Sequence, residues 1–480
     1  MGWMVRKGII LALAFCWAAG PVWPDNPVEV EVWNRTYDGG FDDWASGIAV
    51  DSSGNVYIAG YSGNGSNDDY RTVKYDSAGN AVWNKAYDSG FDDRASGIAV
   101  DSAGNAYVTG WSYNGSIWAY RTIRYDPSGN VVWNKTYDNG MDNGAFDVAV
   151  DSLGCVYVTG LWKNGINQDF RTIKYDSTGS VVWNKTYDSG VADAAHGIAV
   201  DSLGCVYVTG SSGNYPSIDI RTIKYDSAGN VVWNKIYDSG VEDEAFRIAV
   251  DSSGKAHVTG RSGSGVVFDY RTVKYDSSGN ILWNETCTSG FDEQVGGVAV
   301  DSSGNVYVTG TSLGVPNCDF RTIKYDSAGN TVWTNDYDSG FLDEGTGIAV
   351  DSSGYVYVVG LSSGGLNYNF RTIKYRQANI LVGRGKMTIA PNVMDLSAIA
   401  PEVRFFLGGD SGADAEVAIF TSSGRSMGML KVNLGAGGNG MATYSADGID
   451  GWKPGPGSYY AVASGGGVNA TKPFFVVLKR

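Results

Sequence analysis

A repeat of 50 residues, present in seven copies without slippage, constrains the fold more than any other feature of this sequence. The segment Gly-Ile-Ala-Val-Asp-Ser-Ser-Gly-Asn-Val-Tyr-Ile-Ala-Gly starts at Gly47, and close versions start at Gly97, Asp147, Gly197, Arg247, Gly297 and Gly347. A tryptophan recurs at the same period from Trp33 to Trp333. Self-similarity at such a period is typical of propellers and solenoids, in which each unit buries its faces against its neighbours.

Each copy divides into four short strand candidates separated by turn signals. In the first complete copy the candidates are residues 47–50, 56–60, 70–75 and 81–87. Asp-Ser-Ser-Gly-Asn and Asp-Ser-Ala-Gly-Asn lie between them, and Asp, Ser and Gly are the residues that close tight hairpins. No stretch of the chain shows the periodicity of a helix. The pattern predicts an all-β fold built from four-stranded blades.

The two ends of the repeat region favour a closed ring over an open solenoid. Residues 30–37 read as a fourth strand that no first three strands precede. The last copy supplies three strands, ending near Tyr375, and lacks the fourth. Pairing these two ends would remove an exposed sheet edge and tie the chain ends together. We therefore predict a seven-bladed β-propeller over residues 29–376, closed by its N-terminal strand.

The repeat resembles the bacterial seven-bladed propeller repeat family SBBP, whose motif reads roughly Asp-x-x-Gly-Asn-x-Tyr-Val-Thr-Gly. Residues 97–110 and 297–310 match this motif closely, and the resemblance covers residues 30–376. It implies the propeller fold and an exported protein. It implies little about activity, because propellers host enzymes and binding proteins alike.

The N-terminus predicts export. Arg6 and Lys7 precede an apolar stretch, residues 8–19, which is too short to span a bilayer and is followed by small residues. We expect residues 1–24 to be a signal peptide and the protein to be secreted or held at the cell surface. No other segment is long and apolar enough to cross a membrane.

The composition changes after the repeats. Residues 377–386 read as a linker, and residues 387–480 as a small immunoglobulin-like β-sandwich. Three stretches resemble the immunoglobulin-like domain of the flagellar hook-capping protein and the C-terminal sorting domains of type IX secretion: residues 390–392, 417–425 and 454–460. The resemblance implies an envelope-anchoring or sorting module without chemistry of its own.

Charge and histidine content argue against two classes of function. The formal net charge of −15 disfavours a nucleic-acid partner, because phosphate backbones repel an acidic surface. The two histidines, His196 and His257, belong to no triad or zinc motif, and His257 stands where the other copies have Tyr. We therefore expect no catalytic residue and no enzyme.

The loops between the second and third strands vary most between copies, and several carry aromatic residues with no periodic counterpart. A repeated framework with divergent loops on one rim is suited to presenting a binding surface. Exposed aromatic rings favour glycan or protein ligands, although the same rings could instead fold back over the blade edges. The candidates are Tyr61, Trp111, Tyr113, Trp118, Trp162, Tyr215, Phe268 and Tyr368.

Other recurring polar residues suggest structural roles. We expect the seven arginines to be enclosed between blades and paired with carboxylates such as Asp88, Asp92 and Asp93. The same three aspartates are weak candidates for calcium, and no other cofactor is expected. Cys287 and Cys318 fall on the same rim of adjacent blades and are candidates for a disulfide. The arginines are Arg71, Arg121, Arg171, Arg221, Arg271, Arg321 and Arg371.

These observations favour an exported, monomeric, non-catalytic scaffold for binding or adhesion, which presents variable loops to an extracellular glycan or protein. Two alternatives stay open. The first is a secreted propeller enzyme, a lyase or glycan hydrolase, that uses paired acidic rim residues. The second is a structural protein of the cell envelope.

Overall fold

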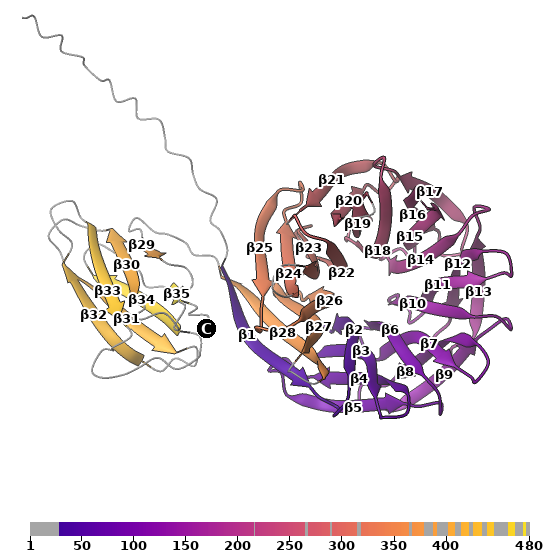
Figure 1. Ribbon diagram of the computed structural model, residues 1–480, viewed down its shortest axis with the longest axis horizontal. Helices are drawn as coiled ribbons and strands as arrows, with labels where there is room; N and C mark the ends of the chain where they lie inside the picture. Colours follow the sequence, from indigo (N-terminus) through magenta and orange to yellow (C-terminus); the bar gives the residue numbers. More distant parts are fainter. Residues whose placement is uncertain are drawn as a thin grey trace, which may run out of the picture. The chain divides into compact units, whose positions relative to one another are not determined.

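The computed structural model divides the chain into two compact units, one of Glu29–Ala378 and one that holds Asn379–Arg480 together with Met1–Val28 (Figure 1). It describes residues 28–378 except 216, 265–266, 289, 314–317 and 364–366, and it describes only the strands of residues 379–480. The expected signal peptide and residues 379–386 of the expected linker lie outside the described residues. In the described part of the chain, no helix is long and apolar enough to cross a membrane.

The first unit consists of seven four-stranded sheets arranged in a ring, so the predicted all-β, seven-bladed propeller is confirmed. Each blade is an antiparallel meander, as the alternation of apolar runs and Gly-containing turns predicts. Blades one to three are β2 (Asp43–Val50), β3 (Val56–Gly63), β4 (Asp68–Tyr75) and β5 (Ala81–Tyr87); β6 (Asp93–Val100), β7 (Ala106–Tyr113), β8 (Trp118–Tyr125) and β9 (Val131–Tyr137); and β10 (Asn143–Val150), β11 (Val156–Lys163), β12 (Gln168–Tyr175) and β13 (Val181–Tyr187).

The remaining blades follow the same plan. Blade seven differs, because β1 is the hydrogen-bonded neighbour of β28 in its sheet. Blades four to seven are β14 (Asp193–Val200), β15 (Val206–Asn214), β16 (Ser217–Tyr225) and β17 (Val231–Tyr237); β18 (Glu242–Val250), β19 (Ala256–Gly263), β20 (Phe268–Tyr275) and β21 (Ile281–Cys287); β22 (Glu293–Val300), β23 (Val306–Leu313), β24 (Cys318–Tyr325) and β25 (Thr331–Tyr337); and β26 (Asp343–Val350), β27 (Tyr355–Ser363), β28 (Tyr368–Ala378) and β1 (Val28–Tyr37).

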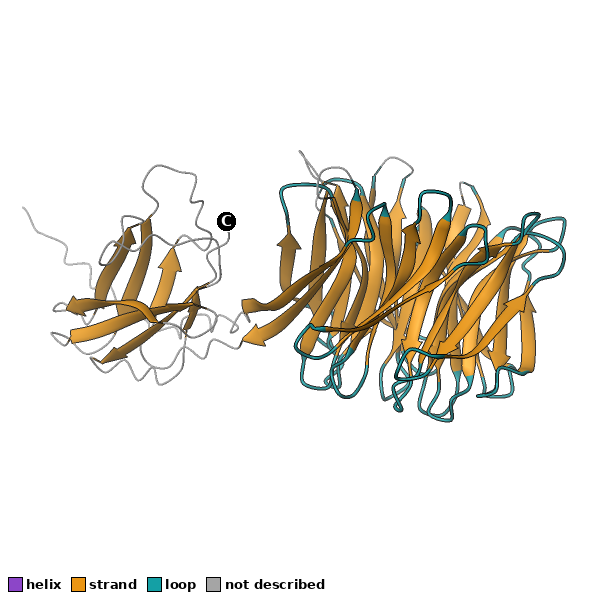
Figure 2. Ribbon diagram, turned by 90° about the horizontal axis from the view of Figure 1, so that it is seen from below, coloured by secondary structure: helices purple, strands orange, loops and turns teal. Residues whose placement is uncertain are grey.

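The connections gather at two faces of the propeller (Figure 2). The face that we call the turn face carries the short Asp-Ser-x-Gly turns. In the first of these, Oδ1 of Asp51 accepts the N–H groups of Ser53 and Asn55 at 2.9 Å, and Gly54 has a φ of 76°. The opposite face, which we call the variable face, carries the loops between second and third strands and the connections between blades.

Every first strand contains a β-bulge. The sequence did not reveal these bulges, because no copy of the repeat is longer than the others. In β2 the register shifts between Ala45, which pairs with Gly60, and Gly47, which pairs with Ala59, so Ser46 is unpaired. A Cβ on Gly60 would lie 2.0 Å from the carbonyl oxygen of Trp44, which explains why glycine is needed there. A bulge changes the direction of a side chain, and here it does so next to the axis of the ring.

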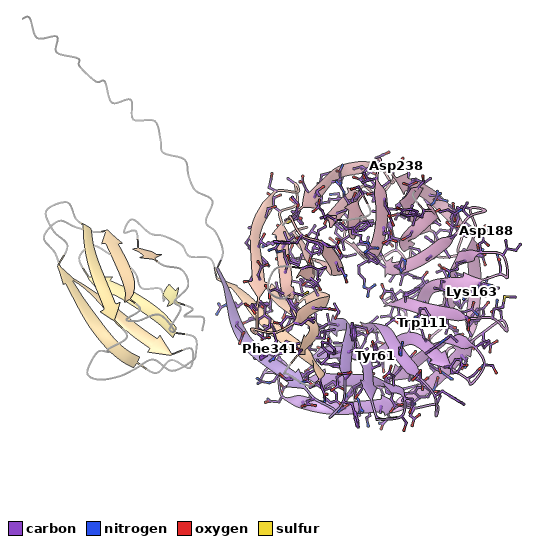
Figure 3. All side chains as sticks on the ribbon, viewed as in Figure 1. Tyr61, Trp111, Lys163, Asp188, Asp238 and Phe341 are labelled. Atoms are coloured by element: carbon purple, nitrogen blue, oxygen red, sulfur yellow. The ribbon has the colours of Figure 1, made fainter. Side chains whose placement is uncertain are left out.

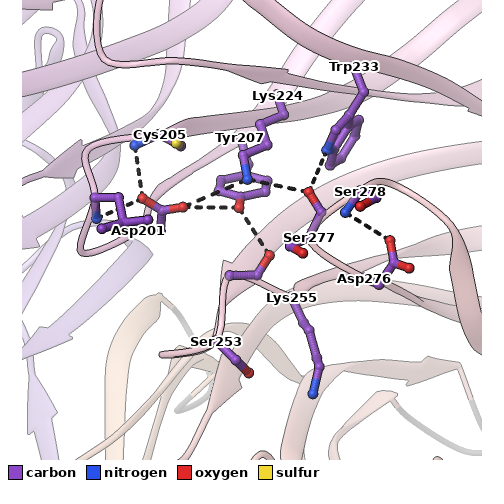
Figure 4. A network of polar contacts seen from close by, with 12 residues as sticks. Asp201, Cys205, Tyr207, Lys224, Trp233, Ser253, Lys255, Asp276, Ser277 and Ser278 are labelled. Carbon is purple, nitrogen blue, oxygen red and sulfur yellow. Dashed lines mark hydrogen bonds and ion pairs between the residues drawn. The ribbon is translucent and has the colours of Figure 1, made fainter.

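Neighbouring blades are joined by aromatic packing and by a polar network at the turn face (Figure 4). Between blades four and five, the indole N–H of Trp233 and the ammonium group of Lys224 donate to the carbonyl of Ser277 at 3.1 and 3.4 Å. The Tyr207 hydroxyl lies 3.1 Å from Oδ2 of Asp201 and 3.0 Å from the Gly254 carbonyl. Because these are repeat positions, the indole bond recurs for six of the seven tryptophans, from Trp33 to Trp283.

The second unit contains two antiparallel sheets. Their orders are β29-β30-β33 and β32-β31-β34-β35. Residues 391–392, 422–425 and 454–458, from the stretches that resemble hook-capping and sorting domains, lie outside the described residues. The strands are β29 (Met387–Ala390), β30 (Glu402–Gly408), β31 (Asp414–Thr421), β32 (Ser426–Asn433), β33 (Asn439–Ser445), β34 (Tyr459–Gly465) and β35 (Phe474–Val476).

Candidate functional site

A cavity of about 560 Å³ is lined by residues of six blades, where their first strands begin and their second strands end. We call it the central cavity. A narrower cavity of about 110 Å³ shares Ser46, Ser96, Arg247 and Gly296 with it and is lined further along the first strands. The lining of the central cavity includes Trp44, Tyr61, Arg94, Trp111, Trp118, Phe146, Phe246, Arg247, Gln294, Thr311 and Glu344.

The bulge residues form one layer of this lining. Six of the seven unpaired bulge residues line the central cavity, from Ser46 in blade one to Thr346 in blade seven. The seventh, His196, lies between Phe146 and Phe246, with ring centroids 4.9 and 5.5 Å away. The bulges therefore place side chains of different kinds, together with Gly296, around a common centre.

Aromatic rings line the side formed by blades one to three. Trp44 and Tyr61 are stacked, with centroids 6.1 Å apart and planes 4° apart. Trp111 meets Trp118 and Phe146 edge to face. Figure 3 places Tyr61 and Trp111 nearer the centre of the ring than Asp188 and Asp238. Such an arrangement offers flat apolar surfaces with fixed orientation.

Glycine at position 144 is needed for one of these rings. A Cβ on Gly144 would come within 2.3 Å of the Trp111 indole. The other copies of this position carry larger side chains, such as Trp44 and Arg94. Trp111 therefore occupies space that a glycine of the next blade leaves open.

Arg94 supplies a donor within the aromatic cluster. Its guanidinium lies 5.5 Å from the Tyr61 centroid and 5.9 Å from the Trp118 centroid, and its Nε donates to Oδ2 of Asp68 at 2.8 Å. Burial raises the pKa of Tyr61 to about 12, an effect that Arg94 partly opposes. Arg94 is thus held in place by a cation–π contact and an ion pair.

Three further titratable groups lie on or beside the cavity. Burial raises the pKa of the Glu344 carboxyl. Burial, helped by Arg247 and Arg261, lowers the pKa of His196 to about 4, so this histidine is neutral near pH 7. Burial also raises the pKa of Asp147, which lies in the narrower cavity and accepts the N–H groups of Val148 and Ile198.

Four segments of the chain match the SBBP beta-propeller repeat: residues 39–67, 89–117, 293–315 and 339–367. These segments cover the first and second strands of blades one, two, six and seven. The match and the seven-sheet ring agree with the resemblance that the Asp-x-x-Gly-Asn-x-Tyr motif suggested. No curated protein matches the chain.

Solved structures resemble the chain at low identity. Puromycin hydrolase is 10% identical with a TM-score of 0.48 over 77% of this chain and 59% of that one, so the chain spans less than two thirds of that enzyme. The propeller domain of the Trilobed protease from Pyrococcus furiosus is 11% identical (TM-score 0.44; 72% and 100% covered). Polysaccharide lyase Uly1 is 10% identical (TM-score 0.47; 72% and 100%). Likenesses of this size imply no shared activity.

The ring of blades brings three of the eight predicted aromatic residues into the central cavity: Tyr61, Trp111 and Trp118. Tyr113 packs on Trp118, with centroids 5.3 Å apart. Tyr368 packs on Trp44 at 6.0 Å, beside the cavity rather than in its lining.

The other three predicted aromatics do not reach the cavity lining. The Arg171 guanidinium lies 3.4 Å from the Trp162 ring centroid, and the Arg261 guanidinium lies 4.3 Å from the Phe268 centroid. Both rings are therefore folded back onto their blades, as the alternative prediction had it. Tyr215 is 75% exposed and lies outside the cavity lining.

The seven recurring arginines lie between blades, but the expected pairing with carboxylates of the connections is wrong for six of them, Arg321 with Glu293 being the exception. Arg71 donates to Oδ1 of Asn84 at 3.3 Å, and Arg121, Arg221, Arg271 and Arg371 make the same type of bond to an asparagine. Asn84 lies on β5, two residues from Ala86, the register partner of Arg71, so it shares the face of the guanidinium. Arg171 donates instead to Thr186 and Tyr137. Among the described bonds, Arg321 alone of the seven forms ion pairs, with Asp336 and Glu293.

Two of the three weak calcium candidates lie together. Asp88 and Asp93 have carboxylate oxygens within 4.8 Å of one another and of Asp69, which the sequence did not single out. Asp92 is not part of this group, because its Oδ1 accepts the N–H of Asp68 at 3.1 Å.

The predicted disulfide is not formed, since Cys287 and Cys318 are free thiols. Cys287 packs with the buried cluster around Tyr270 and Val306, between blades five and six. Cys318 pairs with Leu313 at the loop end of the hairpin that β23 and β24 form in blade six. The packing of the partly buried Cys287 against the inter-blade core explains why a shared rim does not bring the two sulfur atoms together, and burial raises the pKa of both thiols.

Sequence reasoning missed Trp44, Arg94, Phe146, Arg247 and Glu344. The signal that could have found them is the variation of the residue type between copies at fixed positions of the first strand. One such series reads Trp44, Arg94, Gly144, Ala194, Glu244, Gln294 and Glu344, and the bulge series reads Ser46, Ser96, Phe146, His196, Phe246, Gly296 and Thr346.

Proposed function

We propose that the chain is an exported, non-catalytic binding protein whose central cavity holds a carbohydrate. The observation that carries the proposal is the grouping of Trp44, Tyr61, Trp111 and Trp118 around Arg94 in one cavity. The C–H faces of sugar rings pack on aromatic rings, and sugar hydroxyls accept or donate hydrogen bonds. Arg94 would donate to such hydroxyls and Glu344 would accept from them.

The size of the cavity supports a compact ligand over a flat protein surface. Ligand pockets commonly measure about 300–1,000 Å³, and the central cavity lies in that range. A protein ligand stays open as an alternative, since a side chain or loop of a partner could enter the same space.

The experiment is a glycan array probed with the full chain and with two variants, Trp111→Ala and Tyr215→Ala. Trp111 lines the cavity, whereas Tyr215 is an exposed aromatic outside it. We expect the wild type and Tyr215→Ala to bind the same glycans and Trp111→Ala to lose them. Failure of the wild type to bind any glycan would contradict the carbohydrate assignment.

The glycan-hydrolase form of the enzyme alternative needs two carboxylates across the scissile bond. Among the described residues that line the central cavity, Glu344 is the one carboxylate, which favours binding over hydrolysis there. Incubation of the array-positive oligosaccharide with the chain tests this: the release of shorter products would replace the binding proposal by the enzyme. An envelope defect on deletion, without any glycan binding, would favour the structural alternative.

Export and attachment belong to the same proposal. Residues 1–24 would direct secretion. We further infer that the two sheets of residues 387–480 form a sandwich that anchors or sorts the protein. We also infer that β1 closes the ring as the outer strand of blade seven. N-terminal sequencing of the protein from the culture medium tests the first point, because an uncleaved Met1 would contradict it.

A further inference from the structure

Four corners of the variable face, each between two blades, gather three aspartates. Each group has one residue on a third strand, one in the connection between blades, and one at the start of the next blade. One oxygen of each carboxylate lies within 4.8 Å of the others. We call these groups the carboxylate triads; they are Asp69, Asp88 and Asp93; Asp169, Asp188 and Asp193; Asp219, Asp238 and Asp243; and Asp319, Asp338 and Asp343.

The triad between blades three and four contains two buried carboxylates with unsatisfied oxygens. Asp169 is 2% exposed and Asp193 is 1% exposed, whereas Asp188 is exposed. Oδ2 of Asp169 accepts the Asn164 amide at 2.8 Å, and Oδ2 of Asp193 accepts the Ser189 N–H at 2.8 Å. Oδ1 of Asp169 and Oδ1 of Asp193 have no hydrogen-bond partner. Buried polar atoms without partners are rare, so we expect a further group to bind these two oxygens.

The arginine of this blade does not neutralise the triad. Arg171 donates to Tyr137 and Thr186, and its guanidinium lies against the Trp162 ring. Burial raises the pKa of Asp169, and the charges of Asp188 and Asp193 raise it further. At the other three triads a nearby arginine opposes the rise in the pKa of the third-strand aspartate, as Arg71 does for Asp69.

We propose that Asp169, Asp188 and Asp193 bind a calcium ion between blades three and four. Calcium takes oxygen ligands at about 2.3–2.6 Å, so two oxygens bound to one ion lie at most about 5 Å apart. The three carboxylates meet this limit and contain no nitrogen or sulfur ligand that would favour zinc. The ion would connect β12 of one blade with β14 of the next.

The chain contains its own comparison at the corner between blades two and three. There Ala119 and Asn143 stand where the triad has Asp169 and Asp193, and Asp138 is the one acidic residue of the three. The Asn143 amide donates to the Met141 carbonyl at 2.8 Å. The Asn143 amide is thus satisfied by a backbone carbonyl, and this corner lacks the two buried carboxylates to which we assign calcium in the intact triad.

Equilibrium dialysis of the full chain against about 1 mM calcium counts the bound ions directly, because extracellular calcium modules have dissociation constants of about 0.1–1 mM. We expect Asp169→Asn to bind one ion fewer than the wild type. We expect Asp138→Asn, the matched change at the incomplete corner, to bind as many as the wild type. Equal binding by Asp169→Asn and the wild type would overturn the proposal, as would equal losses in both variants.

A measurement on the wild type alone covers the case in which Asp169→Asn fails to fold. A ligand that binds the folded state alone raises the melting temperature. We expect about 5 mM calcium to raise the melting temperature relative to a chelator, and magnesium at the same ionic strength to raise it less, since magnesium demands shorter and more regular coordination. No shift with calcium, or the same shift with both ions, would contradict the assignment.

Discussion

Trp33 and Lys374 donate to the same acceptor, the carbonyl oxygen of Ser77, at 3.2 Å each. Trp33 lies on β1 and Lys374 on β28, at opposite ends of the repeat region. Trp233 and Lys224 converge in the same way on Ser277, although these two residues belong to one continuous blade. Trp33 and Lys374 therefore contact blade one through the same bonds that join the uninterrupted blades.

The first prediction concerns this bond. Trp33→Phe removes the indole donor and keeps an aromatic ring, so we expect the free energy of unfolding to fall by about 1 kcal/mol. Trp233→Phe should cost the same, because the environments match. Urea unfolding of the two variants measures both values. A loss in Trp233→Phe without one in Trp33→Phe would show that β1 does not act as the fourth strand of the last blade.

The second prediction compares an arginine that forms ion pairs with one that donates to a neutral asparagine. Arg321 donates to Asp336 and to the fully buried Glu293, whereas Arg221 donates to the neutral Asn234. Arg321→Met should lower the free energy of unfolding by about 3 kcal/mol, since it leaves a buried carboxylate without its cation. Arg221→Met should cost about 1 kcal/mol. Equal costs in chemical denaturation would mean that the ion pair adds nothing to the inter-blade role.

The third prediction concerns His257, which stands where the other copies of the repeat have tyrosine. This buried ring lies 3.5 Å from Oδ2 of Asp251, and its Nδ1 has no partner. At the equivalent positions tyrosine hydroxyls donate to aspartate at shorter distances, such as 2.9 Å in Tyr107 and 2.8 Å in Tyr357. His257→Tyr should stabilise the fold by about 1 kcal/mol at pH 7. A lower melting temperature of this variant would refute the comparison.

The fourth prediction is a pH dependence that comes from His196. Its pKa is lowered to about 4 in the folded protein, while the unfolded chain keeps the ordinary value near 6.5. As the pH falls between these values, the unfolded state takes up a proton that the folded state refuses, so stability is lost. His196→Phe keeps the stack with Phe146 and Phe246 and removes the proton. Its stability should fall less than that of the wild type between pH 7 and pH 4, and parallel curves would disprove the assignment.

Strand order and blade number followed from the sequence because turn chemistry and apolar runs are local signals that recur seven times. The first strand was the exception. The sequence predicted residues 47–50, whereas β2 extends over Asp43–Val50. Its early residues, Trp44 and Ser46 among them, vary between copies and surround a bulge, so neither alternation nor periodicity marked them as a strand.

The candidate site was only partly predictable for the same physical reason. Tyr61, Trp111 and Trp118 stood out as aromatics in variable segments, and the structure places them in the central cavity. Arg94 and Glu344 were missed, because nothing local in the sequence shows that their first strands are bulged and place them in the cavity lining. The arginine partners were misjudged since charge favoured aspartate, whereas strand register places asparagine beside the guanidinium.

Isothermal titration calorimetry with the tightest glycan from the array tests most directly the central idea that ligand binding resides where the blades depart from their repeat. The comparison uses the wild type, Trp111→Ala in the cavity, and Trp162→Ala, whose ring lies on its own blade outside the cavity lining. We expect Trp111→Ala to weaken binding by about ten-fold or more, and Trp162→Ala to leave the affinity unchanged. Unchanged affinity in Trp111→Ala, or a comparable loss in Trp162→Ala, would contradict the central cavity as the binding site.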